Sequence, residues 1–351
     1  MMIKKFPNNP LITPAMVKPS APDLEVMCAF NAGATVRNGE TLLLVRVAER
    51  PIPQQGYVST AIMDPEDPTA YRTLRIRRKD PKLDFSDPRV FTYDGVLYLT
   101  SISHLRLARS RDGRHFTVDE KPAMRPELPT ETYGIEDPRI TFIDGWYYIN
   151  YSAISLQGVT TALARTRNFA KFERLGTMFA PDNKDIALFP ERIRKRYYCF
   201  HRPSMKHIGA PSMWLASSDN LLDWGHHRLI LGPRPGKWDS ERVGCGAQPL
   251  KTPDGWLTIY HASDEKTRYQ AGAVLLDLKE PWRVLARSRR PVLSPDRPYE
   301  NEGLMPGVVF HNGLADRGDG IVDLYYGAAD TTVCGATMKV GEVLASLKRD
   351  R

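Results

Sequence analysis

Charged and amide side chains recur at turns that precede similar strand-like segments in this 351-residue chain. These turns carry Asn31, Asp87, Arg89, Glu136, Asp137, Arg139, Lys184, Asp185, Arg242 and Glu302. A carboxyl group can donate a proton to a leaving oxygen, and cations can hold an anionic partner. Gathered around one opening of the size of a sugar, these groups would have the chemistry that glycosyl transfer needs.

The segments after these turns repeat one plan, in which an apolar strand turns at a glycine or charged pair and returns as an aromatic strand. Six copies lie at 30–47, 86–103, 136–153, 188–204, 246–263 and 305–330. Their starting points are 50–59 residues apart, which is typical of a blade array rather than of a short solenoid repeat. Further strand candidates lie between the copies, at 105–118, 160–176 and 212–230.

Four short strands per unit with little helix predict an all-β fold. A β-propeller explains the recurrence best, because radial closure removes exposed sheet edges, and six modules would make six blades. A β-sandwich, or two unrelated all-β domains, is the alternative. We predict one domain over 1–351, with 1–29 packing on or closing the propeller and 340–351 forming a short C-terminal helix.

Composition narrows the classes of protein. The chain is 42% hydrophobic and 26% charged with a net charge of +8, and its basic residues are spread along it, so we expect no nucleic-acid partner. No apolar run is long enough for a membrane span, and the first residues lack the apolar core of a secretion signal. The four cysteines form no CxxC pair, and DPEDP (64–68) lacks the spacing of a calcium loop. We therefore expect a cytoplasmic enzyme with no metal.

Several motifs together resemble glycoside hydrolase family 130. They are NAGA (31–34), YGIEDPRI (133–140), DNKDIALFPERI (182–193), HRPS (201–204), WDSERVGCGAQP (238–249), GWLTIYH (255–261), GAVLLDL (272–278) and LYYGAAD (324–330). The resemblance runs from about residue 8 to residue 347. It implies a five-bladed propeller and, in most members, inverting phosphorolysis of β-mannosides to α-mannose 1-phosphate. A minority of members are β-mannoside hydrolases.

The resemblance assigns the proton donor to Asp137 of the EDPR motif, acting through the mannose 3-hydroxyl group. Burial beside Glu136 would favour the protonated acid, whereas an inward-pointing Arg139 would oppose it. The same Asp-Pro-Arg sequence begins at Asp87, and one of the two copies is expected to be only a turn that opens a strand.

The resemblance also assigns a phosphate site and a sugar site. The phosphate site comprises Lys184, Arg202, Arg242, His261 and Tyr269, with Arg202 and Arg242 at places where many phosphorylases carry lysine. The sugar site comprises Asn31, Arg46, Glu136, Asp330 and Phe310. Tyr133 and Trp238 are further candidate platforms for a sugar ring. Gly307 replaces an asparagine common in the family, which leaves the acceptor sugar open.

Three functions follow from these assignments. A phosphorylase needs inorganic phosphate as co-substrate and no other cofactor, with an oligosaccharide as its partner. A hydrolase would need a base that activates water, for which the candidates are Asp239, Glu241, Asp264 and Glu302. A non-catalytic propeller that binds a glycan or a protein is the third alternative. The linkage, the chain length and the choice between monomer and homo-oligomer are left open.

Overall fold

The computed structural model describes residues 2–64, 66–87, 89–204 and 208–349. Nearly all regular structure in these residues is β-strand, so the predicted all-β class is confirmed. The helical elements are three short 3₁₀ turns, at Pro14–Met16, Pro129–Glu131 and Pro298–Glu300, and the helix α1 (Val340–Arg349). The last two residues of the helix expected at 340–351 lie outside the described residues, as does Pro88 of the first Asp-Pro-Arg sequence.

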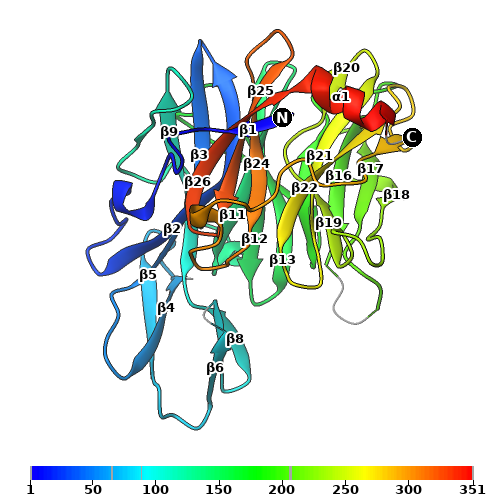
Figure 1. The fold of residues 1–351 in the computed structure, drawn as a ribbon. Coiled ribbons are helices and arrows are strands. Elements are labelled where there is room, and N and C mark those ends of the chain that lie inside the picture. The colour runs from blue at the N-terminus through cyan, green and yellow to red at the C-terminus, as the bar shows by residue number, and fades with distance from the viewer. Residues whose placement is uncertain (1, 65, 88, 205–207, 350–351) are drawn as a thin grey trace.

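Most strands form five antiparallel groups of four (Figure 1). In pairing order they are β1 (Ile3–Lys5), β26 (Thr332–Lys339), β25 (Ile321–Ala328) and β24 (Val309–Asp316); β2 (Leu24–Arg37), β3 (Glu40–Pro51), β9 (Ile102–Ser110) and β10 (Thr117–Val118); β11 (Gly134–Ile143), β12 (Trp146–Ser155), β13 (Gly158–Thr166) and β14 (Glu173–Phe179); β15 (Asn183–Leu188), β16 (Tyr197–Pro203), β17 (Met213–Ser218) and β18 (Gly225–Leu231); and β19 (Arg242–Cys245), β21 (Gly255–Ser263), β22 (Tyr269–Leu276) and β23 (Val284–Arg287). The short β20 (Leu250–Thr252) pairs with β21. A parallel pairing of Gly134 with Ser103 joins the second and third groups into one eight-stranded sheet. Among the described residues, no sheet closes on itself.

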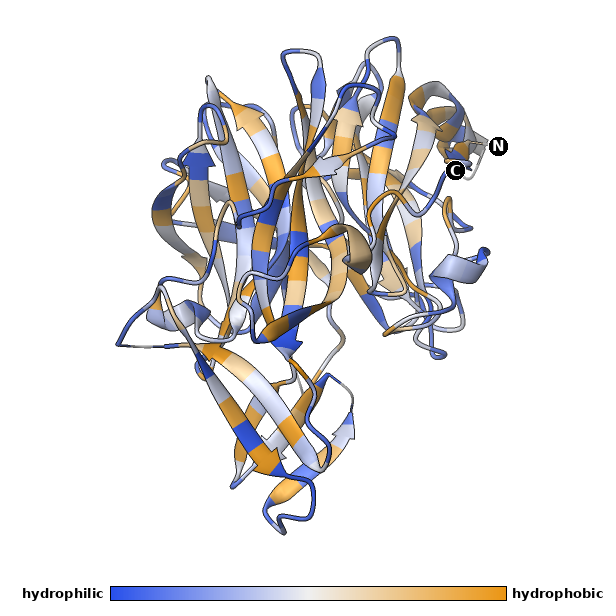
Figure 2. Cartoon of the chain, turned by 90° about the vertical axis from the view of Figure 1, so that its left-hand side faces the viewer, coloured by the Kyte–Doolittle hydropathy of each residue, from blue (hydrophilic) through white to orange (hydrophobic). Residues whose placement is uncertain are grey.

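Five large apolar clusters lie between these groups. Each combines buried residues from two successive groups, and one of them joins the fifth group to the first. Figure 2 shows apolar and polar residues alternating along many strands, as expected where one face of a strand packs on a neighbour. The apolar clusters therefore fix which groups of strands pack against each other.

The hairpin at 86–103 does not begin a four-stranded group. It lies in an insertion between β3 and β9 that contains two small sheets, β4 (Tyr57–Met63) with β5 (Tyr71–Arg77), and β6 (Leu83–Asp87), β7 (Val90–Tyr93) and β8 (Val96–Leu99). Figures 1 and 2 show this insertion projecting from one end of the body. The sixth module found in the sequence is thus a hairpin added to the second group.

One strand in each of four groups carries an irregularity in its pairing. The pairing register shifts between Phe30 and Gly33 in β2, between Glu136 and Arg139 in β11, between Lys184 and Ala187 in β15, and between His311 and Gly313 in β24. Within the first three bulges, Asn31, Asp137 and Asp185 have φ of 45°, 51° and 57°. Asparagine and aspartate adopt this left-handed backbone more readily than other non-glycine residues. The bulges therefore change the direction of these polar side chains relative to a regular strand.

The N-terminal strand completes the sheet of the C-terminal strands, because β1 pairs with β26. The ammonium group of Lys5 contacts Glu300 Oε2 at 2.6 Å and Asp296 Oδ1 at 2.5 Å. Glu300 is fully buried and also accepts a hydrogen bond of 2.8 Å from the Tyr326 hydroxyl group. This ion pair ties the first residues of the chain to its last strands.

We expect Lys5→Met to lower the free energy of unfolding by about 3 kcal/mol, because it leaves the buried Glu300 carboxylate without its cation. Denaturation with guanidinium chloride measures the change. Lys4→Met, on the exposed side of the same strand, is the matched control and should leave stability nearly unchanged. Equal effects of the two substitutions would contradict this role of the ion pair.

Candidate active site

The predicted proton donor lies in a shared network of two carboxylates, an amide and a guanidinium group. Asp137 Oδ1 accepts hydrogen bonds from Asn31 Nδ2 at 2.9 Å and from Arg46 Nη1 at 3.0 Å. Arg46 also pairs with Glu136 Oε1 at 2.6 Å. The side chains of Asp137, Glu136 and Arg46 keep 13%, 15% and 16% of their exposure, so a small ligand can reach them.

A third carboxylate, Asp330, completes this side of the site. It follows β25 in a turn with a left-handed backbone. Burial raises the pKa of Asp330 to about 6, with Asp137 and Glu136 adding to the rise and Arg46 opposing it. Burial also raises the pKa of Glu136, against the effect of Arg46. The site therefore holds a proton more readily than isolated carboxylates would.

A second set of contacts centres on a buried carboxylate, Asp185, which holds a cluster of cations. Asp185 Oδ2 lies 3.0 Å from Arg202 Nε and 3.1 Å from His261 Nε2, and Asp185 Oδ1 lies 3.2 Å from Arg139 Nη2. Burial works to raise the pKa of Asp185, but these neighbours outweigh it and hold the pKa well below the ordinary value. Burial lowers the pKa of His261 to about 4, so its ring is neutral near pH 7.

The remaining residues of the predicted phosphate site adjoin this cluster. Arg242 Nη1 donates a hydrogen bond of 3.0 Å to the Tyr269 hydroxyl group. Burial, and next the charge of Arg202, lower the pKa of Lys184, whereas Asp185, Glu136 and Asp137 raise it. Within the described residues, no carboxylate pairs with the charged end of Lys184 or Arg242. All five predicted residues thus come together, with two cations left available for an anion.

Arg139 connects the two halves of the site. Its guanidinium group is buried and donates to the backbone oxygen of Asp137 at 3.0 Å and of Gly246 at 3.0 Å, besides its contact with Asp185. Arg139 is buried, and its hydrogen bond to Asp137 goes to the main-chain oxygen and not to the carboxylate. It therefore sets the position of the donor relative to the cation cluster.

Glycine leaves room for these contacts. A Cβ atom on Gly244 would lie 2.5 Å from His261 Nε2 and 2.6 Å from Asp185 Oδ2. A Cβ atom on Gly327 would lie 2.0 Å from Asn31 Oδ1. These close approaches explain why glycine stands within two of the motifs, WDSERVGCGAQP and LYYGAAD.

Among the aromatic platforms expected from the sequence, only Phe310 lies beside the cation cluster. Its ring centroid is 4.3 Å from that of His261 and 6.0 Å from that of Tyr269. Trp238 instead stacks on Tyr260 within an apolar cluster. Tyr133 packs against Tyr98 of the insertion.

The carboxylates considered as a base for water are engaged elsewhere or exposed. Asp239 pairs with Arg234 and Arg287 and is fully buried. Asp264 accepts hydrogen bonds from backbone N–H groups of its own turn, and Glu241 and Glu302 are exposed. Asp87 forms an ion pair with Arg89 in the insertion.

The described part of the chain contains no group of three or more His, Cys, Asp or Glu side chains that could hold a metal ion. None of its helices has the length and apolar character needed to cross a membrane.

Comparison with known proteins places the chain in a family. The profile of glycoside hydrolase family 130, described as beta-1,4-mannooligosaccharide phosphorylase, matches residues 90–349. A beta-1,2-mannobiose phosphorylase of Listeria innocua is 46% identical over 352 residues, which cover 99% of each chain. A 1,2-beta-oligomannan phosphorylase of a Thermoanaerobacter species is 42% identical over 69% of this chain and 80% of the relative.

A solved structure agrees with these relatives. The beta-1,2-mannobiose phosphorylase from Listeria innocua, in complex with beta-1,2-mannobiose, superposes with a TM-score of 0.95 at 45% identity over 99% of this chain and all of that one. The chain belongs to glycoside hydrolase family 130. The resemblance stated from its motifs is therefore confirmed.

Because the pKa of Asp330 is raised in the folded protein, we expect its carboxyl group to make the free energy of unfolding depend on pH. Its carboxyl group titrates near pH 4 in the unfolded chain and at about 6 in the folded protein. The folded protein therefore loses stability as pH rises through this window and keeps that loss above pH 6, whereas Asp330→Asn has no such loss. We expect the stability of Asp330→Asn relative to wild type to increase between pH 4 and pH 7, by on the order of 2 kcal/mol.

Urea unfolding across this pH range measures the difference. Asp319→Asn is the matched control, because Asp319 has the same left-handed backbone at an exposed turn. A difference between Asp330→Asn and wild type that stays constant with pH would refute the assignment of a raised pKa.

Proposed function

We propose that this protein catalyses the reversible, inverting phosphorolysis of β-mannosides, which releases α-mannose 1-phosphate and a shortened sugar. The observation that carries the proposal is that Arg139 bonds both to the main chain of Asp137 and to Asp185, the carboxylate that holds the cation cluster. Burial, and next the charge of Arg202, lower the pKa of Lys184, whereas Asp185, Glu136 and Asp137 raise it. The donor network and the cation cluster are therefore both close enough to Lys184 to interact with its charge. The names of the relatives support the same reaction.

The proposed reaction is a single displacement. Lys184, Arg202 and Arg242 hold phosphate, one oxygen of which forms a bond to the anomeric carbon as the glycosidic bond breaks. Asp137 gives its proton to the leaving oxygen through the mannose 3-hydroxyl group. The cations offset the charge of the nucleophile and orient it, so that no covalent enzyme intermediate is needed.

The sugar contacts follow from the donor network. Asn31, Arg46 and Glu136 are proposed to hold the transferred mannose, because they surround Asp137 and remain partly exposed. Asp330 is proposed to reach the acceptor sugar, and Phe310 to pack against a sugar face. We propose a β-1,2 linkage and mannobiose as substrate. The Listeria innocua relative with that name is 46% identical to this chain, and the match covers 99% of both chains.

We further propose that the five groups of strands are the blades of a β-propeller. The five apolar clusters support this reading, because each lies between successive groups and one joins the last group to the first. The four cysteines are free and buried, which supports the cytoplasmic location expected from the sequence.

Phosphate dependence tests the reaction. We expect β-1,2-mannobiose to be cleaved only with inorganic phosphate present, to yield α-mannose 1-phosphate and mannose in equal amounts. Time-resolved NMR identifies the anomer formed. Equal turnover with and without phosphate, yielding only free mannose, would overturn the proposal in favour of a hydrolase.

Removal of the proton donor tests the mechanism. We expect Asp137→Asn to lower kcat roughly 10²–10⁴-fold while the protein stays folded, because asparagine has the same shape and tolerates the left-handed backbone. Asp144→Asn, at the exposed turn of the same β11–β12 hairpin, is the control and should keep full activity. Unchanged kcat in Asp137→Asn would assign the proton to another group.

A further inference from the structure

Three of the five groups of strands contain a fully buried carboxylate in the segment that precedes β11, β19 or β24. Each carboxylate accepts a hydrogen bond from a tyrosine on the strand that pairs with β11, β19 or β24, and it also pairs with a cation on the outermost strand of the group. The carboxylates are Glu131, Asp239 and Glu300, the tyrosines are Tyr151, Tyr260 and Tyr326, and the cations are Arg174, Arg287 and Lys5. We call each of these sets of three side chains an anchor.

The anchor of Asp239 holds the segment that leads into β19. Asp239 Oδ2 accepts a hydrogen bond of 3.1 Å from the Tyr260 hydroxyl group and lies 2.6 Å from Arg287 Nη2. Arg287 Nε donates to the same hydroxyl oxygen at 3.1 Å, so each of the three side chains contacts the other two. Arg242 follows three residues after Asp239 and pairs with Ser263, which follows three residues after Tyr260. The anchor therefore fixes the start of β19, where Arg242 lies.

The side chain of Arg242 has few contacts of its own. Its Nη1 atom donates to the Tyr269 hydroxyl group at 3.0 Å, and its Nε atom is buried without a hydrogen-bond partner in the described part of the chain. The place of this guanidinium group therefore depends on the place of its backbone. Arg242 is one of the three cations that we propose to hold phosphate.

The anchor of Glu131 has the same construction on the strand of the proton donor. Glu131 Oε1 accepts a hydrogen bond of 2.8 Å from the Tyr151 hydroxyl group, and Oε2 lies 3.3 Å from Arg174 Nη2. Glu131 Oε2 also accepts a hydrogen bond of 2.8 Å from the backbone N–H group of Glu127. Asp137 follows six residues after Glu131 on β11. The anchor thus holds the segment from which the donor strand begins.

Stability alone does not explain these anchors. Replacing a buried ion pair by apolar residues of similar volume is often neutral or stabilising. Hydrogen bonds between buried groups are directional, and a fully satisfied buried network makes its surroundings rigid. Buried charges of this kind therefore suit segments whose position matters more than their contribution to the free energy of unfolding.

We propose that Asp239 and Glu131 are positioning residues for the two halves of the reaction. Asp239 sets Arg242 for the binding of phosphate, and Glu131 sets Asp137 for the transfer of the proton. This inference rests on the proposed function. It deepens that function, because it assigns different kinetic effects to two anchors that are built alike.

Steady-state phosphorolysis of β-1,2-mannobiose at varied phosphate concentration tests the inference. We expect Asp239→Asn to raise the KM for phosphate roughly tenfold, because a displaced Arg242 binds phosphate less well, and to change kcat less than about twofold. We expect Glu131→Gln to lower kcat roughly tenfold, because the donor is displaced, and to change the KM for phosphate less than about twofold.

Milder variants remove one hydroxyl group from each anchor and keep its ion pair. Tyr260→Phe should raise the KM for phosphate about threefold, and Tyr151→Phe should lower kcat by a similar factor. Tyr325→Phe is the matched control, because Tyr325 is equally buried and its hydroxyl group donates to the backbone oxygen of Gly113 at 2.9 Å, outside the anchors. All three should lower the melting temperature by comparable amounts, whereas Tyr325→Phe should leave kcat and the KM for phosphate unchanged.

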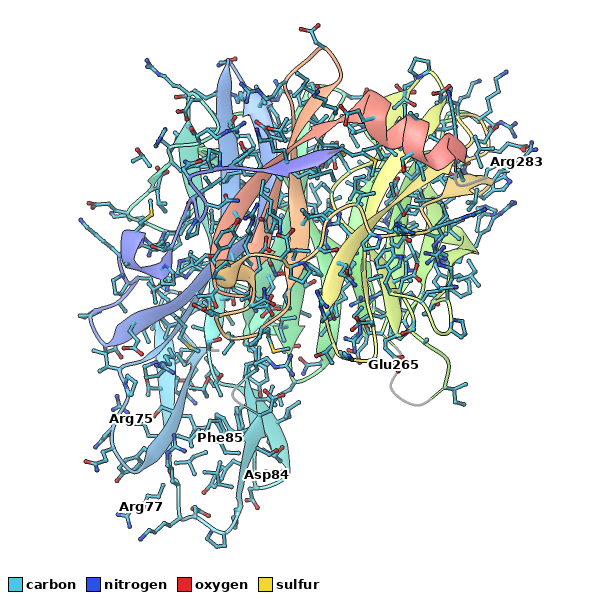
Figure 3. All side chains as sticks on the ribbon, viewed as in Figure 1. Arg75, Arg77, Asp84, Phe85, Glu265 and Arg283 are labelled. Atoms are coloured by element: carbon cyan, nitrogen blue, oxygen red, sulfur yellow. The ribbon has the colours of Figure 1, made fainter. Side chains whose placement is uncertain are left out.

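The cation of the Asp239 anchor offers a second route to the same result. Arg287→Gln should raise the KM for phosphate in the same direction as Asp239→Asn. Arg283→Gln is its control from the same part of the chain. Figure 3 shows Arg283 at the edge of the body, and it is exposed. Arg283→Gln should leave both kinetic parameters unchanged.

The outcomes separate this inference from the proposed function. If wild-type protein cleaves β-1,2-mannobiose equally well without phosphate, the proposed function fails. If wild-type protein depends on phosphate but the Asp239 and Glu131 variants change the same kinetic parameter by similar factors, the inference alone is wrong, because a general loosening acts alike on both. Where the amide variants do not fold, wild-type kinetics in both Tyr260→Phe and Tyr151→Phe would overturn it.

Discussion

The cation cluster depends on the buried carboxylate of Asp185. Arg139, Arg202, Lys184 and Arg242 would repel one another strongly in a region largely shielded from water. Asp185 neutralises one charge and accepts contacts from three side chains, while His261 remains neutral and adds none. The cluster keeps a net positive charge that suits an anion without the full repulsion of its members. The same carboxylate orients Arg139, and through it the strand of Asp137.

The bulges give this network its geometry. A regular strand alternates its side chains between two faces, so an unbroken strand would send neighbouring polar residues to opposite sides. An extra residue with a left-handed backbone changes that direction locally. The bulge positions need a residue that adopts a left-handed backbone, and the site needs a polar side chain there. Asparagine and aspartate meet both needs at Asn31, Asp137 and Asp185, because their short polar side chains tolerate this conformation. The same kind of bulge therefore presents the amide of Asn31, the proposed acid Asp137 and the carboxylate of Asp185 that pairs with the cations.

The parts of the fold that depend on local pattern could be predicted from the sequence. Alternating apolar residues and turn residues located most strands, but the hairpin at 86–103 has the same local pattern as the others. What distinguishes it is its set of partner strands, which is a property of the tertiary structure. The resemblance to a family located the phosphate residues. The role of Asp185 was missed because an acid beside phosphate ligands looks unfavourable until its three partners are known.

Several polar atoms of the site are buried without a hydrogen-bond partner among the described residues, and the apolar clusters between the groups of strands supply the stability that offsets this cost. Asn31 Oδ1, Arg242 Nε and His261 Nδ1 are buried without a hydrogen-bond partner among the described residues. Each such group costs about 1–3 kcal/mol in the free protein. A bound sugar or anion that pairs with them would regain this free energy, whereas solvent-exposed groups would have less to gain. The apolar clusters between the groups supply the stability that lets the centre remain preorganised for a ligand instead of being satisfied by its own side chains.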